Sequence, residues 1–202
     1  MRFFSLVFVL SFAFLSPSVP FRQSSLIPST SSPTIAKKIS VPGVPNAGKV
    51  SDSLFRGAQP HLANLDELKK LGITTIVDLR RESAHTREHE RVQAESLGIH
   101  FVSIPVGGFS PPTSSQLAQF FTLIREAPVQ RVFVHCEFGE DRTGVFIAAY
   151  RIAFEHWSSD EALTEMLAFG FNRHWHPSMV SFVRALPDRL HSDPTLKSAL
   201  GN

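Results

Sequence analysis

Short apolar runs alternate with amphipathic stretches along much of the chain. Apolar residues that recur every three or four positions predict helices over Pro60 to Leu71 and in a stretch beginning at Thr113. A polar helix is predicted over Glu82 to Leu97, ended by Gly98. Three apolar runs have the length and composition of buried strands: Ile73 to Leu79, His100 to Ile104 and Val132 to Val134. Strands that alternate with helices favour a layered α/β fold.

The first 18 residues do not follow this pattern. Arg2 precedes an apolar stretch from Phe3 to Leu15, and Ser16-Pro17-Ser18 supplies small residues for cleavage after Ser18. This order is typical of a secretory signal peptide and predicts export to the periplasm or the medium. The apolar stretch is shorter than the roughly 20 residues of a membrane span, although an uncleaved N-terminal anchor is the alternative. We expect contact with a membrane only in that second case.

Residues 19–49 are rich in Ser, Pro and Thr, a composition that buries too little apolar surface to offset the entropy of ordering. We therefore expect a linker there, a catalytic domain over residues 50–190 and a C-terminal tail over residues 191–202. The formal net charge of +2, without any run of Lys or Arg, gives no reason to expect a nucleic-acid partner.

The stretch from Val132 to Arg151 is the most informative part of the chain. A buried strand is followed by a short loop with Gly139 and then by an apolar helix, an arrangement that forms an anion-binding cradle of backbone N–H groups. Cys136, the single cysteine, stands at the start of the loop, where a thiolate would be stabilised. Arg142, after five intervening residues, is placed to hold two phosphate oxygens. A thiolate that attacks phosphorus there would form a cysteinyl-phosphate, which water then hydrolyses.

The segment from His135 to Gly144, HCEFGEDRTG, resembles the H-C-x5-R-[ST]-G signature of the cysteine-dependent protein tyrosine and dual-specificity phosphatases. The resemblance implies that Cys136 is the nucleophile, that Arg142 binds phosphate, that Thr143 hydrogen-bonds the thiolate and that His135 orients the loop. It also implies a phosphate-binding loop made of Glu137, Phe138, Gly139, Glu140, Asp141 and Arg142. It implies no cofactor and no metal ion.

The resemblance extends over roughly Ser53 to Leu190, and three further segments look like the opening of small bacterial dual-specificity-like phosphatases: Leu54 to Pro60, Leu68 to Ile73 and Val77 to Arg80. It implies a central, mostly parallel sheet of four or five strands flanked by helices, as in protein tyrosine phosphatases. Arg56 and Arg80 are candidates for substrate binding, and the alternative for Arg80 is a surface charge or a pair with Asp78.

One feature of the family is missing. Most of these phosphatases carry an Asp about thirty residues before the Cys that protonates the leaving oxygen, but residues 100–113 contain no Asp or Glu. Asp141 is the nearest substitute, because myotubularin-type lipid phosphatases have an Asp in the matching position, to which the acid role has been assigned. Asp141 as an acid and Asp141 as a brace of the loop both remain open. The weaker candidates for the acid are three histidines, His100, His174 and His176.

The five variable residues between Cys136 and Arg142 include three carboxylates, which would repel additional phosphate groups on a substrate. We therefore expect a phosphatase that acts on a phosphomonoester, either a protein phosphorylated on tyrosine, serine or threonine or a small aryl phosphate. The alternatives are a phosphoinositide or inositol phosphate phosphatase, a catalytically weak phosphate-binding module and a sulfurtransferase. A zinc site at His85-Thr86-Arg87-Glu88-His89 matches the H-x-x-E-H pattern, but the surrounding charges favour a solvated helix.

Overall fold

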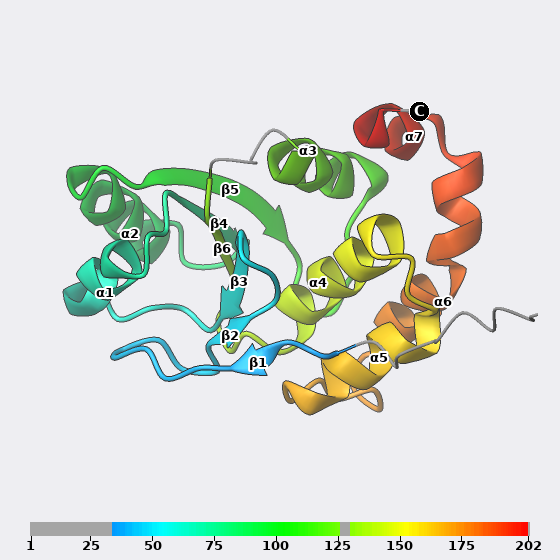
Figure 1. Cartoon of the computed structure of the whole chain (residues 1–202), viewed down its shortest axis with the longest axis horizontal. Coiled ribbons are helices and arrows are strands. Elements are labelled where there is room, and N and C mark those ends of the chain that lie inside the picture. Colours follow the sequence, from blue (N-terminus) through cyan, green and yellow to red (C-terminus); the bar gives the residue numbers. More distant parts are fainter. Residues whose placement is uncertain (1–33, 126–129, 202) are drawn as a thin grey trace, which may run out of the picture. The chain divides into compact units, whose positions relative to one another are not determined.

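The computed structural model of the chain describes residues 34–125 and 130–201 (Figure 1). Strands and helices alternate as the apolar pattern predicts. The expected signal peptide and residues 19–33 of the expected linker lie outside the described residues, so cleavage and export remain predictions. The strands are β1 Lys37–Lys38, β2 Gly48–Lys49, β3 Leu54–Gly57, β4 Thr75–Arg80, β5 His100–Val106 and β6 Val132–His135. The helices are the 3-10 turn η1 Leu62–Asn64, then α1 Leu65–Lys70, α2 Ala84–Ser96, α3 Ser114–Arg125, α4 Asp141–Phe154, α5 Ser159–Ala168, α6 Pro177–Ser192 and α7 Pro194–Leu200.

The six strands form one sheet in the order β1-β2-β3-β6-β4-β5. The four strands β3, β6, β4 and β5 pair in parallel, and β1 and β2 add two short antiparallel strands at one edge. The predicted α/β class with a mostly parallel, helix-flanked sheet is confirmed. The strand count exceeds the expected four or five because β1 and β2 come from residues predicted to form a linker.

Successive side chains of the central strands point to opposite faces of the sheet. Val77 and Val134 belong to the core shared with α3 to α7, whereas Ile76 and Phe133 belong to the core shared with α1 and α2. Figure 1 shows these two groups of helices on either side of the sheet. Because both faces are covered, β3, β4 and β6 are buried along their whole length and are largely apolar, as in other parallel sheets.

The folded part begins earlier than the boundary predicted near residue 50. Lys37 and Lys38 of β1 pair with β2, which in turn pairs with β3, and the side chains of Ala36, Val44 and Ala47 are buried. The linker prediction is therefore wrong for residues 34–49. A segment poor in apolar residues is ordered here because the free edge of β3 offers backbone hydrogen bonds that composition does not reveal.

The chain end is also part of the fold rather than the predicted tail. Helix α6 continues through Pro187, which has no N–H to bond the carbonyl of Val183 four residues earlier. The hydroxyl of Ser159 donates to that carbonyl at 3.0 Å and replaces the missing bond. Beyond α6, Leu196 and Ala199 of α7 are buried in the core beside α3.

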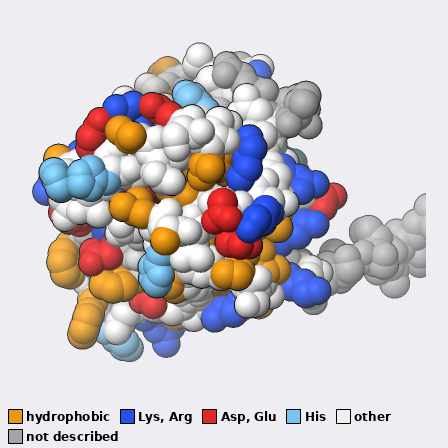
Figure 2. Space-filling model, turned by 90° about the vertical axis from the view of Figure 1, so that its left-hand side faces the viewer, with side chains coloured by type: hydrophobic (Ala, Val, Ile, Leu, Met, Phe, Trp, Pro, Cys, Tyr) orange, Lys and Arg blue, Asp and Glu red, His pale blue; other side chains and the backbone are white. Residues whose placement is uncertain are grey.

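The surface on the side of α1 and α2 carries acidic and basic side chains interspersed with small apolar groups (Figure 2). Among the described residues, no helix combines the length and apolar character needed to cross a membrane.

Candidate active site

The centre of the sheet positions the only cysteine. Strand β6 lies between β3 and β4, and Cys136 follows its carboxyl end, with 3% of its surface exposed. Residues 136–140, starting with Cys136 itself, form the nucleophile loop, and α4 begins directly after this loop at Asp141. A parallel strand and a following helix N-terminus bring backbone N–H groups and partial positive charge to this point, which favours an anion.

The buried side of the nucleophile loop packs closely against β3. Gly139 has a φ of +71°, and a Cβ there would lie 2.4 Å from the backbone carbon of Gly57, so only glycine fits. Arg56 is fully buried and donates from Nη2 to the carbonyl oxygen of Gly139 at 2.8 Å. Its guanidinium lies 3.9 Å from the ring centroid of Phe169. Burial lowers the pKa of Arg56 to about 10, so the side chain is still charged near neutral pH. Arg56 therefore braces the loop from inside and does not reach the open pocket, contrary to the substrate-binding role considered for it.

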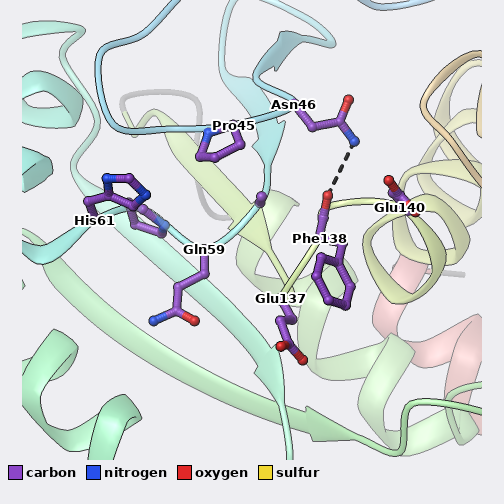
Figure 3. A pocket seen from close by; sticks show the side chains of 9 residues that line it. Pro45, Asn46, Gln59, His61, Glu137, Phe138 and Glu140 are labelled. Carbon is purple, nitrogen blue, oxygen red and sulfur yellow. Dashed lines mark hydrogen bonds between the residues drawn. The ribbon is translucent and has the colours of Figure 1, made fainter.

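Asn46 holds the same loop from the segment that was predicted to be a linker. Its side-chain amide donates to the carbonyl oxygens of Phe138 and Gly139, each at 3.3 Å, and of Phe169 at 2.9 Å. Figure 3 shows the amide directed at the backbone of Phe138. Asn46 adopts a positive φ of 52°, which asparagine tolerates better than most residues. Sequence reasoning missed Asn46 because nothing local connects it to a loop some ninety residues later.

His135 connects the loop to a buried network of charges. Its Nδ1 lies 3.1 Å from the carbonyl oxygen of Cys136, and its Nε2 lies 2.9 Å from Oε1 of Glu90 on α2. Burial acts to lower the pKa of His135, but the charge and hydrogen bond of Glu90 together with the charge of Asp78 outweigh it, and the pKa is raised. These contacts suit the loop-orienting role that the resemblance implies.

Arg80 belongs to this network and not to the pocket. Its guanidinium donates to both carboxylate oxygens of Asp78, at 2.8 and 3.0 Å, and to Glu90 at 2.7 Å. Only 3% of Arg80 is exposed. Of the two interpretations of Arg80, the structure shows the pair with Asp78, extended by Glu90, and leaves no role in substrate binding.

Arg142 is held at one nitrogen and open at the others. Its Nη1 donates to both carboxylate oxygens of Glu82, at 2.9 and 2.7 Å, and contacts the carbonyl oxygen of Val106 at 3.3 Å. All of its hydrogen bonds to the described residues come from Nη1, so the edge formed by Nε and Nη2 is free for a phosphate.

Glu82 is a site residue that sequence reasoning missed, although its place just after β4, at the carboxyl edge of the sheet, is where such folds build sites. Burial acts to raise the pKa of Glu82, but hydrogen bonds from its own backbone N–H and from Arg142 outweigh this and hold the pKa below its usual range. Glu82 is therefore ionised near neutral pH and positions Arg142 rather than supplying a proton.

A cavity of about 460 Å³ opens above Cys136. Three of its side chains are large, apolar and exposed: Phe109 at 73%, Phe138 at 62% and Trp175 at 72%. Among the described residues that line it, Arg142 is the single Lys or Arg. The full lining consists of Glu82, Gly108, Phe109, Cys136, Glu137, Phe138, Glu140, Asp141, Arg142, Gly170, Asn172, Trp175 and His176.

A second hollow of about 470 Å³ adjoins the first and shares Glu137, Phe138 and Glu140 with it. Its other lining residues come from the segments before and after β3, including Asn46, Gln59 and His61 (Figure 3). The backbone N–H of Gln59 donates to the carbonyl oxygen of Glu137 at 3.1 Å, so this wall is joined to the nucleophile loop.

Asp141 and His176 meet at the edge of the catalytic pocket. Oδ2 of Asp141, in the first turn of α4, lies 3.2 Å from Nε2 of His176, which precedes α6. Of the three histidines considered as acids, His176 is therefore the one that the fold brings to the site; His100 and His174 do not line the pocket. Thr143 is fully buried, and its Oγ1 has no hydrogen-bond partner among the described residues. The bond from Thr143 to the thiolate that the resemblance implies is thus not formed in this structure.

The H-x-x-E-H segment does not assemble a metal site. The rings of His85 and His89 lie 4.1 Å apart on α2, but Glu88 is bound by Arg91 at 2.5 and 2.9 Å. No cluster of three His, Cys, Asp or Glu side chains suited to a metal ion occurs in the described part of the chain.

Comparison with known proteins gives the family. Residues 44–180 match the model of a family described as DSP-PTPase phosphatase fused to NAD+ kinase. The dual specificity protein phosphatase TpbA of Pseudomonas aeruginosa is 30% identical over 129 residues, which cover 62% of this chain and 55% of TpbA. Human dual specificity protein phosphatase 26 is 27% identical over 127 residues, which cover 60% of this chain and 58% of that protein. The chain thus spans a little more than half the length of these curated relatives.

Solved structures agree with the fold. The crystal structure of P. aeruginosa TpbA has a TM-score of 0.65 at 24% identity and covers 86% of this chain and 100% of that one. A TpbA structure in complex with pTyr has a TM-score of 0.66 at 22% identity, with the same coverage. The core catalytic domain of the PP-IP phosphatase SIW14 from S. cerevisiae has a TM-score of 0.65 at 20% identity and covers 80% of this chain and 97% of that one. Since the family model matches more than half of the chain, and Cys136 and Arg142 of the signature line one pocket, this chain belongs to the cysteine-dependent dual-specificity and tyrosine phosphatase family.

Proposed function

We propose that this protein hydrolyses phosphomonoesters through a cysteinyl-phosphate intermediate. The observation that carries the proposal is the position of Cys136 in the wall of a cavity together with Arg142, whose Nε and Nη2 make no bond to the described residues. A phosphate held by this edge and by the loop N–H groups would place its phosphorus near the sulfur. The family to which the chain belongs supports the same chemistry.

In the first step the thiolate of Cys136 attacks phosphorus, a sulfur–phosphorus bond forms, and the bond to the leaving oxygen breaks. In the second step water attacks the phosphorus, inorganic phosphate leaves and the thiolate is restored. The three non-bridging oxygens carry the developing charge in both steps, and Arg142 and the loop amides stabilise it. Glu82 contributes by fixing Nη1 of Arg142, which sets the plane of the guanidinium.

The substrate we propose is an aryl phosphate, such as phosphotyrosine in a protein. Exposed aromatic side chains at the pocket, Phe109, Phe138 and Trp175, offer rings on which an aromatic leaving group can pack. Exposed apolar side chains of this size that gather at one cavity are typical of binding sites. TpbA, a relative of this chain, has been crystallised in complex with pTyr.

The second candidate, an inositol phosphate or phosphoinositide, has less support. Four carboxylates line the cavity, Glu82, Glu137, Glu140 and Asp141, against the single cation of Arg142 among the described lining residues. Several phosphates on one ring would meet repulsion from these carboxylates. The structural resemblance to the PP-IP phosphatase SIW14, at 20% identity, concerns the fold alone.

The test compares wild type with Cys136→Ser on 4-nitrophenyl phosphate, a phosphotyrosine peptide, a phosphoserine peptide and inositol hexakisphosphate. We expect turnover of the first two by wild type and none by the variant, with vanadate or phosphate binding retained. Turnover by Cys136→Ser would exclude the cysteinyl-phosphate route. A wild-type preference for inositol hexakisphosphate would favour the second candidate, and binding without any turnover would favour a phosphate-binding module.

A further inference from the structure

Asp141 and His176 form an acidic and basic pair that the proposed steps have not yet used. The two side chains meet at 3.2 Å between Oδ2 and Nε2, and both line the cavity that contains Cys136. They come from distant elements, the first turn of α4 and the residue before α6. The rings of Phe109 and Phe171 stack on the imidazole with centroids 5.1 and 6.0 Å away, so its orientation is fixed by packing.

The remaining polar atoms of the pair have no competing partner. Oδ1 of Asp141 and Nδ1 of His176 are both buried and lack a hydrogen bond to any described residue. Only 5% of His176 is exposed. A buried polar atom without a partner is costly in a native structure and points to a function that uses it.

The reaction needs a proton donor, and the other candidates are poorly suited. Residues 100–113 contain no carboxylate, and Glu82 is ionised and bound to Arg142. Glu140 also lines the cavity, and burial raises its pKa, but its carboxyl group lies against Gly170, where an added Cβ would come within 2.8 Å of the Glu140 carboxyl carbon. Among the described residues, the carboxylate of this cavity with a histidine partner is Asp141. Asp141, directly before Arg142, is the carboxylate nearest in sequence to the group that holds the phosphate.

We propose that Asp141 and His176 share the proton that is delivered to the leaving oxygen. This inference rests on the proposed phosphatase function. Asp141 is the group that would touch the substrate, whereas His176 is a positioning residue that acts through Asp141 and resupplies it. A separate loop acid is then unnecessary, because the donor is built into the start of α4 and is held there by α6.

The proton balance is closed over the two steps. The protonated pair holds one transferable proton, shared between Nε2 of His176 and Oδ2 of Asp141. In the first step this proton passes through Asp141 to the leaving oxygen as the bond from that oxygen to phosphorus breaks, which leaves a neutral imidazole and an ionised carboxylate. In the second, the pair takes a proton from the water that attacks the cysteinyl-phosphate. The pair therefore begins and ends each cycle with the same number of protons.

The charges around the pair determine when it carries the proton. Asp141 faces the imidazole from α4, and the side chains packed on its ring, Phe109 and Phe171, are uncharged. The other titratable or charged groups of the cavity are Glu82, Cys136, Glu137, Glu140 and Arg142. A bound phosphate dianion adds negative charge beside the pair and so favours its protonated form. The pair should thus carry its proton in the complex with substrate, which is when the leaving oxygen needs it.

The test uses the full chain with His176→Gln, which keeps a side-chain N–H donor for Asp141 but cannot carry the proton. We expect a loss of roughly 10²-fold in kcat on phenyl phosphate, where the leaving oxygen needs a proton, and less than about tenfold on 4-nitrophenyl phosphate. Asp141→Asn should show the same dependence on the leaving group, and the double variant should lose no more than the larger single loss. Wild type should show a fall in kcat at high pH on phenyl phosphate, and this fall should disappear in both variants.

His174→Gln is the matched control, since His174 is an exposed histidine two residues away that does not line the cavity. It should behave as wild type on both substrates. A loss of equal size on both substrates for His176→Gln would show a structural role only and overturn the proposal. A leaving-group-dependent loss in Glu140→Gln but not in His176→Gln would assign the acid elsewhere. If His176→Gln does not fold, Asp141→Asn and the wild-type pH profile still decide: a profile without a fall at high pH overturns the proposal.

These outcomes are separate from failure of the proposed function. If wild type hydrolyses no phosphate ester, or if Cys136→Ser remains active, the phosphatase mechanism itself is wrong. If wild type is active and Cys136→Ser is not, only the behaviour of Asp141 and His176 is in question.

Discussion

On its buried side the nucleophile loop is held by side chains from distant segments, whereas its open side, together with Arg142 of α4, has groups that are free to bind a ligand. Arg56 and Asn46 both donate to the carbonyl oxygen of Gly139, and His135 contacts the carbonyl oxygen of Cys136. On the open side Phe138 is 62% exposed and two nitrogens of Arg142 have no partner among the described residues.

This difference explains how a loop of five residues can keep an anion site in shape. Backbone carbonyls that are bonded from behind cannot turn into the pocket, so the N–H groups of the same peptides stay directed toward the phosphate. The bracing cations serve structure, and the one cation left for the substrate is Arg142 among the described residues of the cavity. Charge alone therefore does not identify a substrate-binding arginine; what identifies it is that its unpaired nitrogens belong to a side chain that lines the cavity, as in Arg142 and not in the fully buried Arg56.

The largest expected effect comes from removing the brace supplied by the N-terminal segment. A chain beginning at Ser51 lacks β1, β2 and Asn46 and exposes the edge of β3. We expect it to lose cooperative thermal unfolding and all activity on 4-nitrophenyl phosphate. A chain beginning at Thr34 keeps every described residue and should match the full-length protein. Equal melting temperatures for the two truncated chains would mean that residues 34–50 are dispensable, and the buried side would then be much less important than we infer.

The next effect concerns the open side. Arg142→Lys keeps the charge but not the planar edge of Nε and Nη2, so phosphate can no longer be held by two parallel bonds. We expect a loss of at least roughly 10²-fold in kcat/KM, with little change in melting temperature. Arg91→Lys, on the surface of α2, is the control and should change neither quantity. Kinetics near wild type for Arg142→Lys would place phosphate binding elsewhere.

The two sides also differ in how far the sequence predicts them. The open side follows from a local pattern, because Cys136, Asp141 and Arg142 lie within one strand–loop–helix segment whose apolar flanks define it. The buried side depends on contacts across the chain, such as Asn46 with Gly139 or Glu90 with His135, and these leave no local signal.

The errors of prediction have the same origin. Arg56 and Arg80 are candidates for the substrate because they are basic, and Arg80 also because it stands at the end of a strand, but burial and the partners they find there decide their roles. Composition predicts a linker for residues 34–49 because it contains no information on a sheet edge that can pair with them. Glu82 follows the end of a strand and His176 precedes a helix, and both positions are predictable from the sequence. Which side chain at these positions faces the cavity is visible only in the fold.

The smallest expected effect is a change in pH dependence on the buried side. Glu90 raises the pKa of the buried His135 above its ordinary value of 6.5, so the folded state binds a proton that the unfolded state releases more easily. The resulting stabilisation is fully present below about pH 6.5 and is lost as the pH rises through the higher pKa of the folded state. The free energy of unfolding of wild type should therefore fall over this interval when it is measured by urea titration at a series of pH values.

Glu90→Gln removes the charge that holds the proton on His135 while keeping a side chain of the same size. We expect roughly 1–3 kcal/mol of destabilisation at pH 6, because a buried donor loses its charged partner. The difference from wild type should shrink as the pH rises, since above the raised pKa His135 is neutral in both proteins. Arg80 keeps its two bonds to Asp78 in the variant, so any remaining loss at high pH measures the bond from Arg80 to Glu90. A difference that stays constant with pH would mean that His135 is neutral in the folded protein, and that the loop is held by geometry rather than by charge.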